Sequence, residues 1–383
     1  MFDGRIDRRK LVGLAALALL AGCKVIPKGP VEPAPPPTGP TSDMLPSDSQ
    51  RHRVALLVPL SGPNAAVGQS IANAAAMALL DTSASNLRVT NYDTSAGAAS
   101  AAAKAVADGN KLILGPLLSE DIPAVAATAK GANVPVISFS NDEGAAKRDV
   151  FIMGNLPSES VERTVRYARS QGVKTFAALV PQGEYGQRAS AALMAAARAE
   201  GGTVVGMETY DRSNTSVASA ARRLKDKGGY DAVLIADGGR IAALSAPVLK
   251  GKATTTRLLG TELWSGEGVI ASTPSIRGAW FSAVADTRFR QFTSSYKSRF
   301  GTQPYRIATL GYDGVLLTLR VARDWKPGTT FPIAKLLDRG GFLGLDGPFR
   351  FNRGGVIERA LEVREVKAGG VVTVSPAPTA FEN

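Results

Sequence analysis

The stretch VALLVPLSGPNAAVGQS, residues 54–70, has the composition of a ligand-binding corner between a strand and a helix. A nucleotide-binding P-loop reads Gly, four residues and then Gly-Lys-Ser/Thr, because its lysine must reach the phosphates. Here five residues separate the two glycines, and Gln69 stands at the lysine position. We therefore predict a strand-to-helix corner at which Ser61, Asn64 and backbone N–H groups meet a ligand other than a nucleotide.

Few side chains in this chain are suited to catalysis. Cys23 is the only cysteine and His52 the only histidine, which argues against a Ser-His-Asp triad, a multi-histidine zinc site or a cysteine nucleophile. We expect His52 at the edge of a linker, outside any apolar pattern. Ser294-Ser295-Tyr296-Lys297 matches S-x-x-K, but no K-T-G or S-D-N partner occurs. We predict a protein that is not an enzyme, with no catalytic residue, no cofactor and no metal site.

The N-terminal 22 residues have the pattern of a lipoprotein signal peptide. A basic stretch, Arg8-Arg9-Lys10, precedes an apolar run that is too short to span a bilayer. The run ends in Leu-Ala-Gly-Cys23, which resembles the lipobox of bacterial lipoproteins, in which the cysteine is lipidated and becomes the new N-terminus. Lys24 stands where inner-membrane retention usually requires aspartate, so we predict the outer membrane rather than the inner one. The alternative is an ordinary signal peptide with a buried thiol.

Residues 23–50 are rich in proline and short polar side chains and predict a semi-extended spacer behind the lipidated cysteine. The chain carries a formal net charge of +12. This charge favours contact with anionic surfaces such as lipid headgroups, although an ordinary solvated basic surface explains it equally well. No basic run is interleaved with aromatic residues, so we predict no nucleic-acid partner.

From Arg51 onward, apolar strands alternate with alanine-rich helices and short Gly/Pro/Asn/Asp connections. Such alternation is typical of a doubly wound parallel sheet with helices on both faces. The pattern restarts after about residue 155, so we predict an α/β fold with two doubly wound parallel-sheet lobes and a cleft between them. The expected strands are 54–59, 87–92, 111–114, 134–139, 175–180, 203–207, 232–235 and 257–260.

The order of several stretches resembles type I periplasmic binding proteins, the fold of the leucine/isoleucine/valine receptors. The matching stretches are VALLVPLSGPNAAVGQ, VTNYDTSAG, LILGPLLS, VPVISFSND, GEYGQRASAALMAAARAEGGTVV and YDAVLIAD. In this family the chain crosses between the lobes three times, and the resemblance places the crossings near Asn155, Ser282 and Gly340. The implied division is lobe 1 at 51–155 plus 283–340, lobe 2 at 156–282 plus 341–375, and a tail at 376–383.

Within this fold, LLVPLSGP, ILGPLLSED, LLGTELW and ATLGYDGVLLTLRVA resemble LpoA-like lipoprotein activators of penicillin-binding proteins. This resemblance implies a lipid-anchored periplasmic regulator that docks on bifunctional peptidoglycan synthases. Well-studied members carry a helical-repeat domain ahead of the lobes, whereas here we expect only the short spacer in that position. The alternative is a receptor for an amino acid or similar zwitterion that feeds an ABC transporter.

The resemblance to the amino-acid receptors also implies a set of ligand-binding residues. Ser119, Ser138 and Ser140 fall at first-lobe strand ends, where hydroxyls meet the ligand carboxylate, or they simply cap helices and loops. Tyr185 matches the tyrosine that closes over the ligand, and packing is its alternative role. Glu262 matches the glutamate that pairs with the ligand ammonium group; in a vacant cleft it is a solvated loop charge.

Three further residues carry weaker expectations. Trp264 either lines the cleft or seals the end of a strand against its lobe. For Asp93 we expect a helix N-cap rather than a ligand contact. Asp313 is expected near the start of a first-lobe helix, with a structural role.

Overall fold

The computed structural model describes residues 50–213, 215–250 and 255–381. The predicted signal peptide 1–22, the lipidation site Cys23 and all but the last residue of the spacer lie outside the described residues. The following description concerns these residues. Among the residues that the structure describes, no helix is long and apolar enough to cross a membrane.

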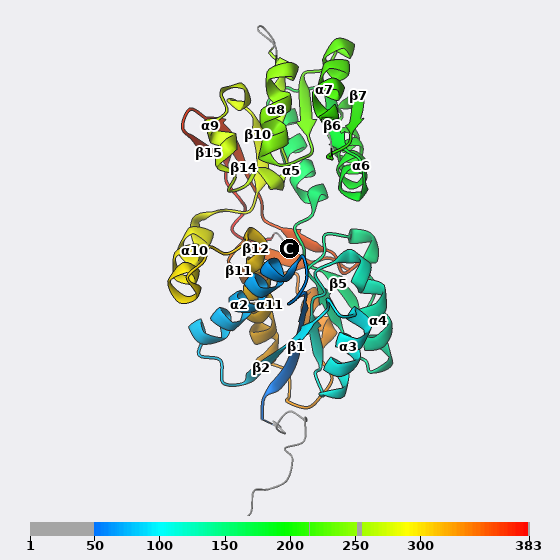
Figure 1. The fold of residues 1–383 in the computed structure, drawn as a ribbon, viewed down its shortest axis with the longest axis vertical. Helices are drawn as coiled ribbons and strands as arrows, with labels where there is room; N and C mark the ends of the chain where they lie inside the picture. The colour runs from blue at the N-terminus through cyan, green and yellow to red at the C-terminus, as the bar shows by residue number, and fades with distance from the viewer. Residues whose placement is uncertain (1–49, 214, 251–254, 382–383) are drawn as a thin grey trace, which may run out of the picture. The chain divides into compact units, whose positions relative to one another are not determined.

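The first lobe is built on a five-stranded sheet in which every strand pairing is parallel (Figure 1). Residues 54–58 of its β1 are completely buried, as expected for a strand that helices cover on both faces. The strands, in the order β2-β1-β3-β4-β5, are Leu87–Asp93, His52–Val58, Leu112–Leu114, Val136–Ser138 and Val150–Ile152. The helices are α2 (Ala65–Asp81), α3 (Ala98–Ala107), α4 (Ile122–Gly131), α10 (Thr287–Phe300) and α11 (Thr309–Ala322).

The second lobe has a seven-stranded sheet in the order β15-β14-β10-β9-β8-β6-β7. The five strands β6 (Thr175–Pro181), β7 (Thr203–Tyr210), β8 (Ala232–Ile235), β9 (Arg257–Leu259) and β10 (Trp280–Ala283) are parallel. β14 (Glu362–Lys367) and β15 (Gly370–Ser375) extend this sheet antiparallel at one edge. The helices are α5 (Pro157–Ser170), α6 (Glu184–Ala199), α7 (Ser216–Lys227), α8 (Gly239–Lys250) and α9 (Gly268–Ser272).

The two lobes repeat one strand order. If β6 to β10 are counted from one to five, their order is 2-1-3-4-5, the same as that of β1 to β5. This is a doubly wound order, in which ligands bind outside the carboxyl ends of the strands. The predicted fold class is confirmed, and the antiparallel edge of the second sheet is an addition to it.

The prediction for the third crossing is wrong. Strands β11 (Phe342–Gly344), β12 (Gly347–Phe351) and β13 (Ile357–Arg359) form a separate antiparallel sheet. Their aromatic residues join the first-lobe core, where Phe351 packs edge-on against Phe151 with ring centroids 5.2 Å apart. Residues 341–359 therefore belong to the first lobe, and the chain crosses at Ala360 and Leu361 rather than near Gly340. The other crossings follow β5 and β10.

One further expectation changes in the structure. His52 is the first residue of β1, is 3% exposed and stacks on Trp325 with ring centroids 4.1 Å apart, so it lies in the core and not at a linker edge.

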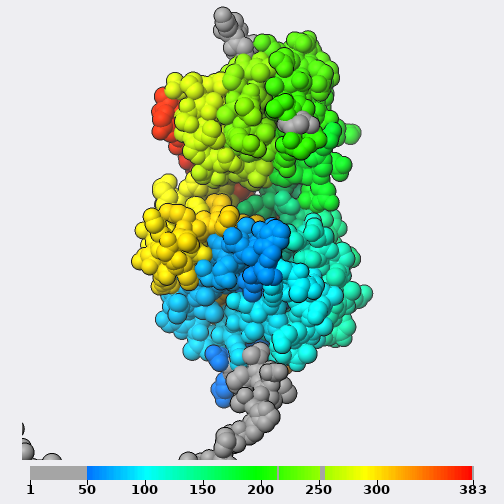
Figure 2. Space-filling view, viewed as in Figure 1, coloured from blue at the N-terminus to red at the C-terminus, as the bar shows by residue number. Residues whose placement is uncertain are grey.

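α10 lies against α2 on the surface of the first lobe (Figure 2), where Phe292 and Tyr296 pack with Met77. The last described residues return to the first lobe, where the Arg350 guanidinium lies 4.7 Å from the ring centroid of Phe381.

Two arginines next to the third crossing hold the other two crossings. Nη2 of Arg359 donates to the carbonyl of Met153 (2.7 Å), and Nη2 of Arg364 donates to the carbonyl of Val284 (2.6 Å). Nη1 of Arg364 also pairs with Asp286 at 2.5 Å. Both arginines are buried, and buried cations are stable only when paired in this way.

We expect Arg364→Ala to lower the free energy of unfolding by about 3–5 kcal/mol, because it leaves buried acceptors at two crossings without their partner. Chemical denaturation measures this change. Lys367→Ala is the matched control, since Lys367 on the same strand forms an exposed pair with Glu365 and should cost at most about 1 kcal/mol. Equal losses in the two variants would contradict the clamping role of Arg364.

Candidate ligand site

The corner that follows β1 is held by internal contacts. Asp93 accepts hydrogen bonds from the backbone N–H of Leu60 (2.8 Å) and from the hydroxyl of Ser61 (2.7 Å), and these donors hold its pKa well below the usual range. Asp93 therefore ties two loops together, and the N-cap of α3 is Gly97 instead. Asn64 stands at the N-cap of α2 without a side-chain capping bond.

A glycine in each lobe explains the glycine in residues 54–70 that the sequence analysis compared with a P-loop. A Cβ at Gly68 in α2 would lie 1.7 Å from the carbonyl oxygen of Pro59, and a Cβ at Gly186 in α6 would lie 1.8 Å from that of Pro181. Only glycine lets each helix start directly on the end of its strand. The spacing in residues 54–70 thus serves helix–strand packing.

A cavity of about 700 Å³ opens at the carboxyl ends of β3, β4 and β9. The first lobe contributes the turns after β3 and β4, and the second lobe contributes the turn after β9. The charged residues in its wall are Glu120, Glu262, Glu267 and Arg306, of which Glu120 and Glu267 are exposed. The other lining residues are Leu117, Leu118, Ser119, Phe139, Ser140, Asn141, Asn155, Leu263, Ser265, Gly266, Phe289, Pro304 and Ile307.

The structure brings three of the predicted ligand residues, Ser119, Ser140 and Glu262, into this wall. Ser138 is fully buried, and its hydroxyl donates to the carbonyl of Pro116 at 2.9 Å, so it shapes the turn after β4. Ser61, Asn64 and Tyr185 are also absent from the wall of the 700 Å³ cavity.

Tyr185 lies behind Glu262 and orients its carboxylate. The Tyr185 hydroxyl donates to Oε1 of Glu262 at 2.9 Å and lies 2.9 Å from the hydroxyl of Thr261. Burial raises the pKa of Tyr185 well above its ordinary value, so the phenol keeps its proton for this bond. The resemblance implied that Tyr185 closes over the ligand, whereas in the structure its hydroxyl contacts Thr261 and Glu262.

The second carboxylate oxygen of Glu262, Oε2, is buried and has no hydrogen-bond partner among the described residues. Burial raises the pKa of Glu262 to about 7, although the Tyr185 hydrogen bond opposes the shift. One oxygen of this carboxylate, which belongs to the cavity wall, is thus fixed by Tyr185, and the other has no partner. This arrangement suits a cation or a hydrogen-bond donor on a ligand.

Trp264 seals the strand end. It is 1% exposed, its indole N–H donates to the carbonyl of Asp237 at 2.8 Å, and a Cβ at Gly260 would lie 2.2 Å from the ring. The packing of Trp264 on Gly260 fixes the turn that carries Glu262.

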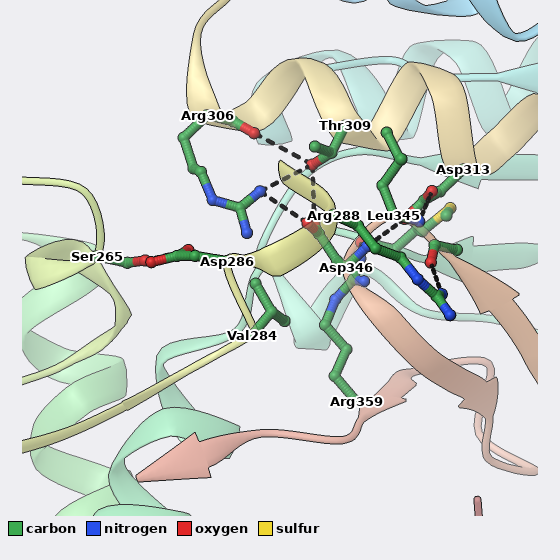
Figure 3. Close-up of polar contacts among 12 residues, drawn as sticks. Ser265, Val284, Asp286, Arg288, Arg306, Thr309, Asp313, Leu345, Asp346 and Arg359 are labelled. Atoms are coloured by element: carbon green, nitrogen blue, oxygen red, sulfur yellow. Dashed lines mark hydrogen bonds and ion pairs between the residues drawn. The ribbon is translucent and has the colours of Figure 1, made fainter. Parts of the chain in front are cut away.

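A polar cluster from the first lobe flanks the cavity and was not predicted from the sequence (Figure 3). Nη1 of Arg306 pairs with Asp346 at 2.7 Å, and Asp346 accepts from the hydroxyl of Thr309 at 2.8 Å. The Arg306 guanidinium lies 4.2 Å from the ring centroid of Phe289. Asp313, within α11, accepts from the backbone N–H of Leu345 at 2.6 Å. Its position in a first-lobe helix and its structural role agree with expectation.

A second cavity, of about 40 Å³, adjoins the first. The two cavities share Asn155, Glu262, Ser265 and Arg306 in their walls. The small cavity adds Glu159 and Arg359 from the crossing region. Burial raises the pKa of Glu159 to about 8, although the charge of Arg359 opposes the shift.

Two doubly wound lobes joined by three crossings, with a cavity at their strand ends, have the architecture of type I periplasmic binding proteins. A family model described as "Periplasmic binding protein" matches residues 52–371, and the chain belongs to this family. Membership implies a periplasmic protein.

Solved structures show the same fold. A putative branched-chain amino acid ABC transporter from Rhodospirillum rubrum aligns with a TM-score of 0.75 at 20% identity, covering 85% of this chain and 100% of that one. A branched-chain amino acid transporter substrate-binding protein from Streptococcus pneumoniae, solved with isoleucine, aligns with a TM-score of 0.64 at 19% identity, covering 86% and 100%. A solute-binding protein of an ABC transporter from R. palustris, solved with benzoate, gives 0.63 at 18%, covering 86% and 97%.

One curated relative is an uncharacterized protein, RP748, from Rickettsia prowazekii (strain Madrid E), which is 30% identical over 175 residues. The match spans 45% of this chain and about half (47%) of that relative.

We expect Glu262→Gln to change how stability depends on pH. In the unfolded chain the carboxyl loses its proton near pH 4.5, whereas the folded protein holds it up to about pH 7. The native state then binds more protons, so Glu262 makes stability fall as pH rises across this window, by at most about 1.4 kcal/mol per pH unit. The glutamine variant should gain stability relative to the parent between these pH values and level off above.

Urea unfolding at several pH values measures this difference. Glu267→Gln is the control, because Glu267 lies in the same wall but is exposed. If the two variants gave parallel curves, the burial of the Glu262 carboxyl would be contradicted.

Proposed function

We propose that this protein is a non-enzymatic solute receptor that binds an amino acid or similar zwitterion and presents it to an ABC transporter. The observation that carries the proposal is the buried carboxylate of Glu262, with one oxygen held by Tyr185 and the other unpartnered at the cavity wall. A solute ammonium group supplies the missing donor. The hydroxyls of Ser119 and Ser140 and the nearby backbone N–H groups, across the cavity, suit the solute carboxylate.

The similar structures support this choice over the activator role. Those named above are transporter or solute-binding proteins, and two of them were solved with a small organic acid or amino acid. Docking on a peptidoglycan synthase, which the LpoA-like resemblance implies, stays a prediction with no surface assigned to it. Pull-down of peptidoglycan synthases by this protein would be the first evidence for it.

Calorimetric titration of the purified full-length protein with amino acids tests the receptor function. We expect micromolar binding of at least one amino acid and a loss of about 10- to 100-fold in Glu262→Gln, because an ionised hydrogen bond is removed. Binding should weaken by up to about tenfold per pH unit below 7, since the amine requires the deprotonated carboxylate.

Glu162→Gln is the control for the binding assay, because Glu162 forms an exposed pair with Arg166 on α5. It should bind as the parent does. If no amino acid in the panel bound, the proposed receptor function would be overturned.

We also propose that Cys23 carries a lipid that holds the receptor at a membrane, the outer one in a two-membrane cell. Cys23→Ser should abolish incorporation of labelled palmitate and release the protein into the soluble periplasmic fraction. Lys24→Asp should keep the label and move the protein toward the inner membrane. Unchanged labelling in Cys23→Ser would contradict the anchor.

A further inference from the structure

The charged side chains with unpartnered buried atoms gather at one place. Among the described residues these atoms are Oε2 of Glu262, Nη2 of Arg306, and Nε and Nη1 of Arg359. All three side chains line the 40 Å³ cavity. The other unpartnered buried atoms, such as Nδ1 of His52 and the indole nitrogen of Trp280, belong to neutral groups outside this cavity.

Among the charged residues of this cavity wall, donors without a hydrogen-bond partner outnumber acceptors without one. Three guanidinium nitrogens lack a hydrogen-bond partner, against one carboxylate oxygen that lacks one. An ionised group left without a partner in a buried position costs free energy. The wall therefore requires acceptors from whatever fills the cavity, and an anionic group supplies them best.

The guanidinium groups are held rigidly. Arg306 is fixed by Asp346 on Nη1 and by the ring of Phe289. Arg359 is 8% exposed, and its Nη2 is fixed on the carbonyl of Met153. Figure 3 shows Arg306 and Arg359 approaching Asp346 from different elements, α11 and its preceding turn for one and β13 for the other. Preorganised donors of this kind bind an acceptor without further ordering cost.

The charged residues that line the cavity are Arg306, Arg359, Glu159 and Glu262. Asp346 and Asp313 lie near the two arginines, and Arg364, paired with Asp286, contacts the lining residues Ser265 and Val284. Asp346 is paired with Arg306, and Glu159 accepts from the backbone N–H of Arg359 rather than from its side chain. Asp313 is occupied by the backbone of Leu345. None of these bonds satisfies the three unpartnered nitrogens.

We propose that the 40 Å³ cavity is an anion compartment of the solute site, so that the preferred solute carries an acidic side chain besides its amine and its own carboxylate. The inference rests on the proposed receptor function. The volume holds two or three waters or one carboxylate group. The shared wall formed by Glu262 and Arg306 lets one molecule occupy both cavities.

Matched isosteres test the proposal: glutamate against glutamine, and aspartate against asparagine, titrated into the full-length protein. We expect each acid to bind at least tenfold more tightly than its amide, because only the acid makes charge-assisted bonds to the guanidinium groups. Arg306→Gln should reduce this ratio to near one. Arg290→Gln, an exposed change of the same charge on α10, should leave the ratio intact.

Arg306→Gln leaves Asp346 without its partner, so the double variant Arg306→Gln/Asp346→Asn serves where the single one fails to fold. The proposal is overturned if acid and amide bind equally, which is the result expected of a cavity that holds only water. It is also overturned if Arg306→Gln weakens the binding of leucine and of glutamate by the same factor. Arg306 would then bind the carboxylate that both amino acids share. Absence of binding by every amino acid would instead overturn the receptor function itself.

Discussion

Burying arginine side chains at the third crossing constrains the rest of this molecule. Two lobes that are joined only by three strands of chain could adopt many relative arrangements. Arg359 and Arg364 fasten the first and second crossings to the third through the carbonyls of Met153 and Val284. A buried guanidinium tolerates little displacement, because each lost partner leaves a desolvated charge. The same Arg359 lines the small cavity, so one set of bonds fixes both the crossings and the cavity wall.

The two lobes share one way of packing a helix on a strand end, but they contribute different polar side chains to the cavity. Both start a helix on the carbonyl end of their first strand through a glycine, Gly68 in one and Gly186 in the other. Both therefore bring short turns to the carboxyl edge of a sheet. The first lobe contributes hydroxyl and arginine donors at this edge, whereas the second contributes the Glu262 carboxylate. A solute with separated charges complements this division better than an apolar one does.

The alternation of apolar strands and alanine-rich helices was sufficient to predict eight of the ten parallel strands that the structure describes, because both periodicities are local. Strands β5 and β10 and the antiparallel strands β11 to β15 were not predicted. Glu262 was also found, since it follows a buried strand in a stretch that resembles the amino-acid receptors. Arg306 and Arg359 escaped notice because their contacts are distant: Asp346 lies 40 residues from Arg306, and Met153 lies 206 residues from Arg359. Ser138 shows the opposite failure. It lies two residues from Ser140, but the fold of the turn after β4 buries its hydroxyl on Pro116.

The third crossing was misplaced for a related reason. Strands β11 to β13 were not predicted from the sequence, and the sequence of residues 342–359 does not say which core their aromatic side chains join. Phe349 and Phe351 join the first lobe because Phe151 and the β5 edge are available there, with Ile152 bridging to Val356. Assigning such a sheet requires the edge against which it packs, and edges are a property of the assembled lobes.

Unsatisfied buried groups distinguish a binding site from a stable core. A sequence selected for stability alone would pair Oε2 of Glu262 and the free N–H bonds of Arg306 and Arg359, or replace these residues with apolar ones. The structure instead keeps rigid supports behind each group: Tyr185 for the carboxylate, Asp346 and Met153 for the guanidinium groups. The remaining polar atoms of these groups have no hydrogen-bond partner among the described residues. A solute with the complementary charges supplies these partners on supports that are already ordered.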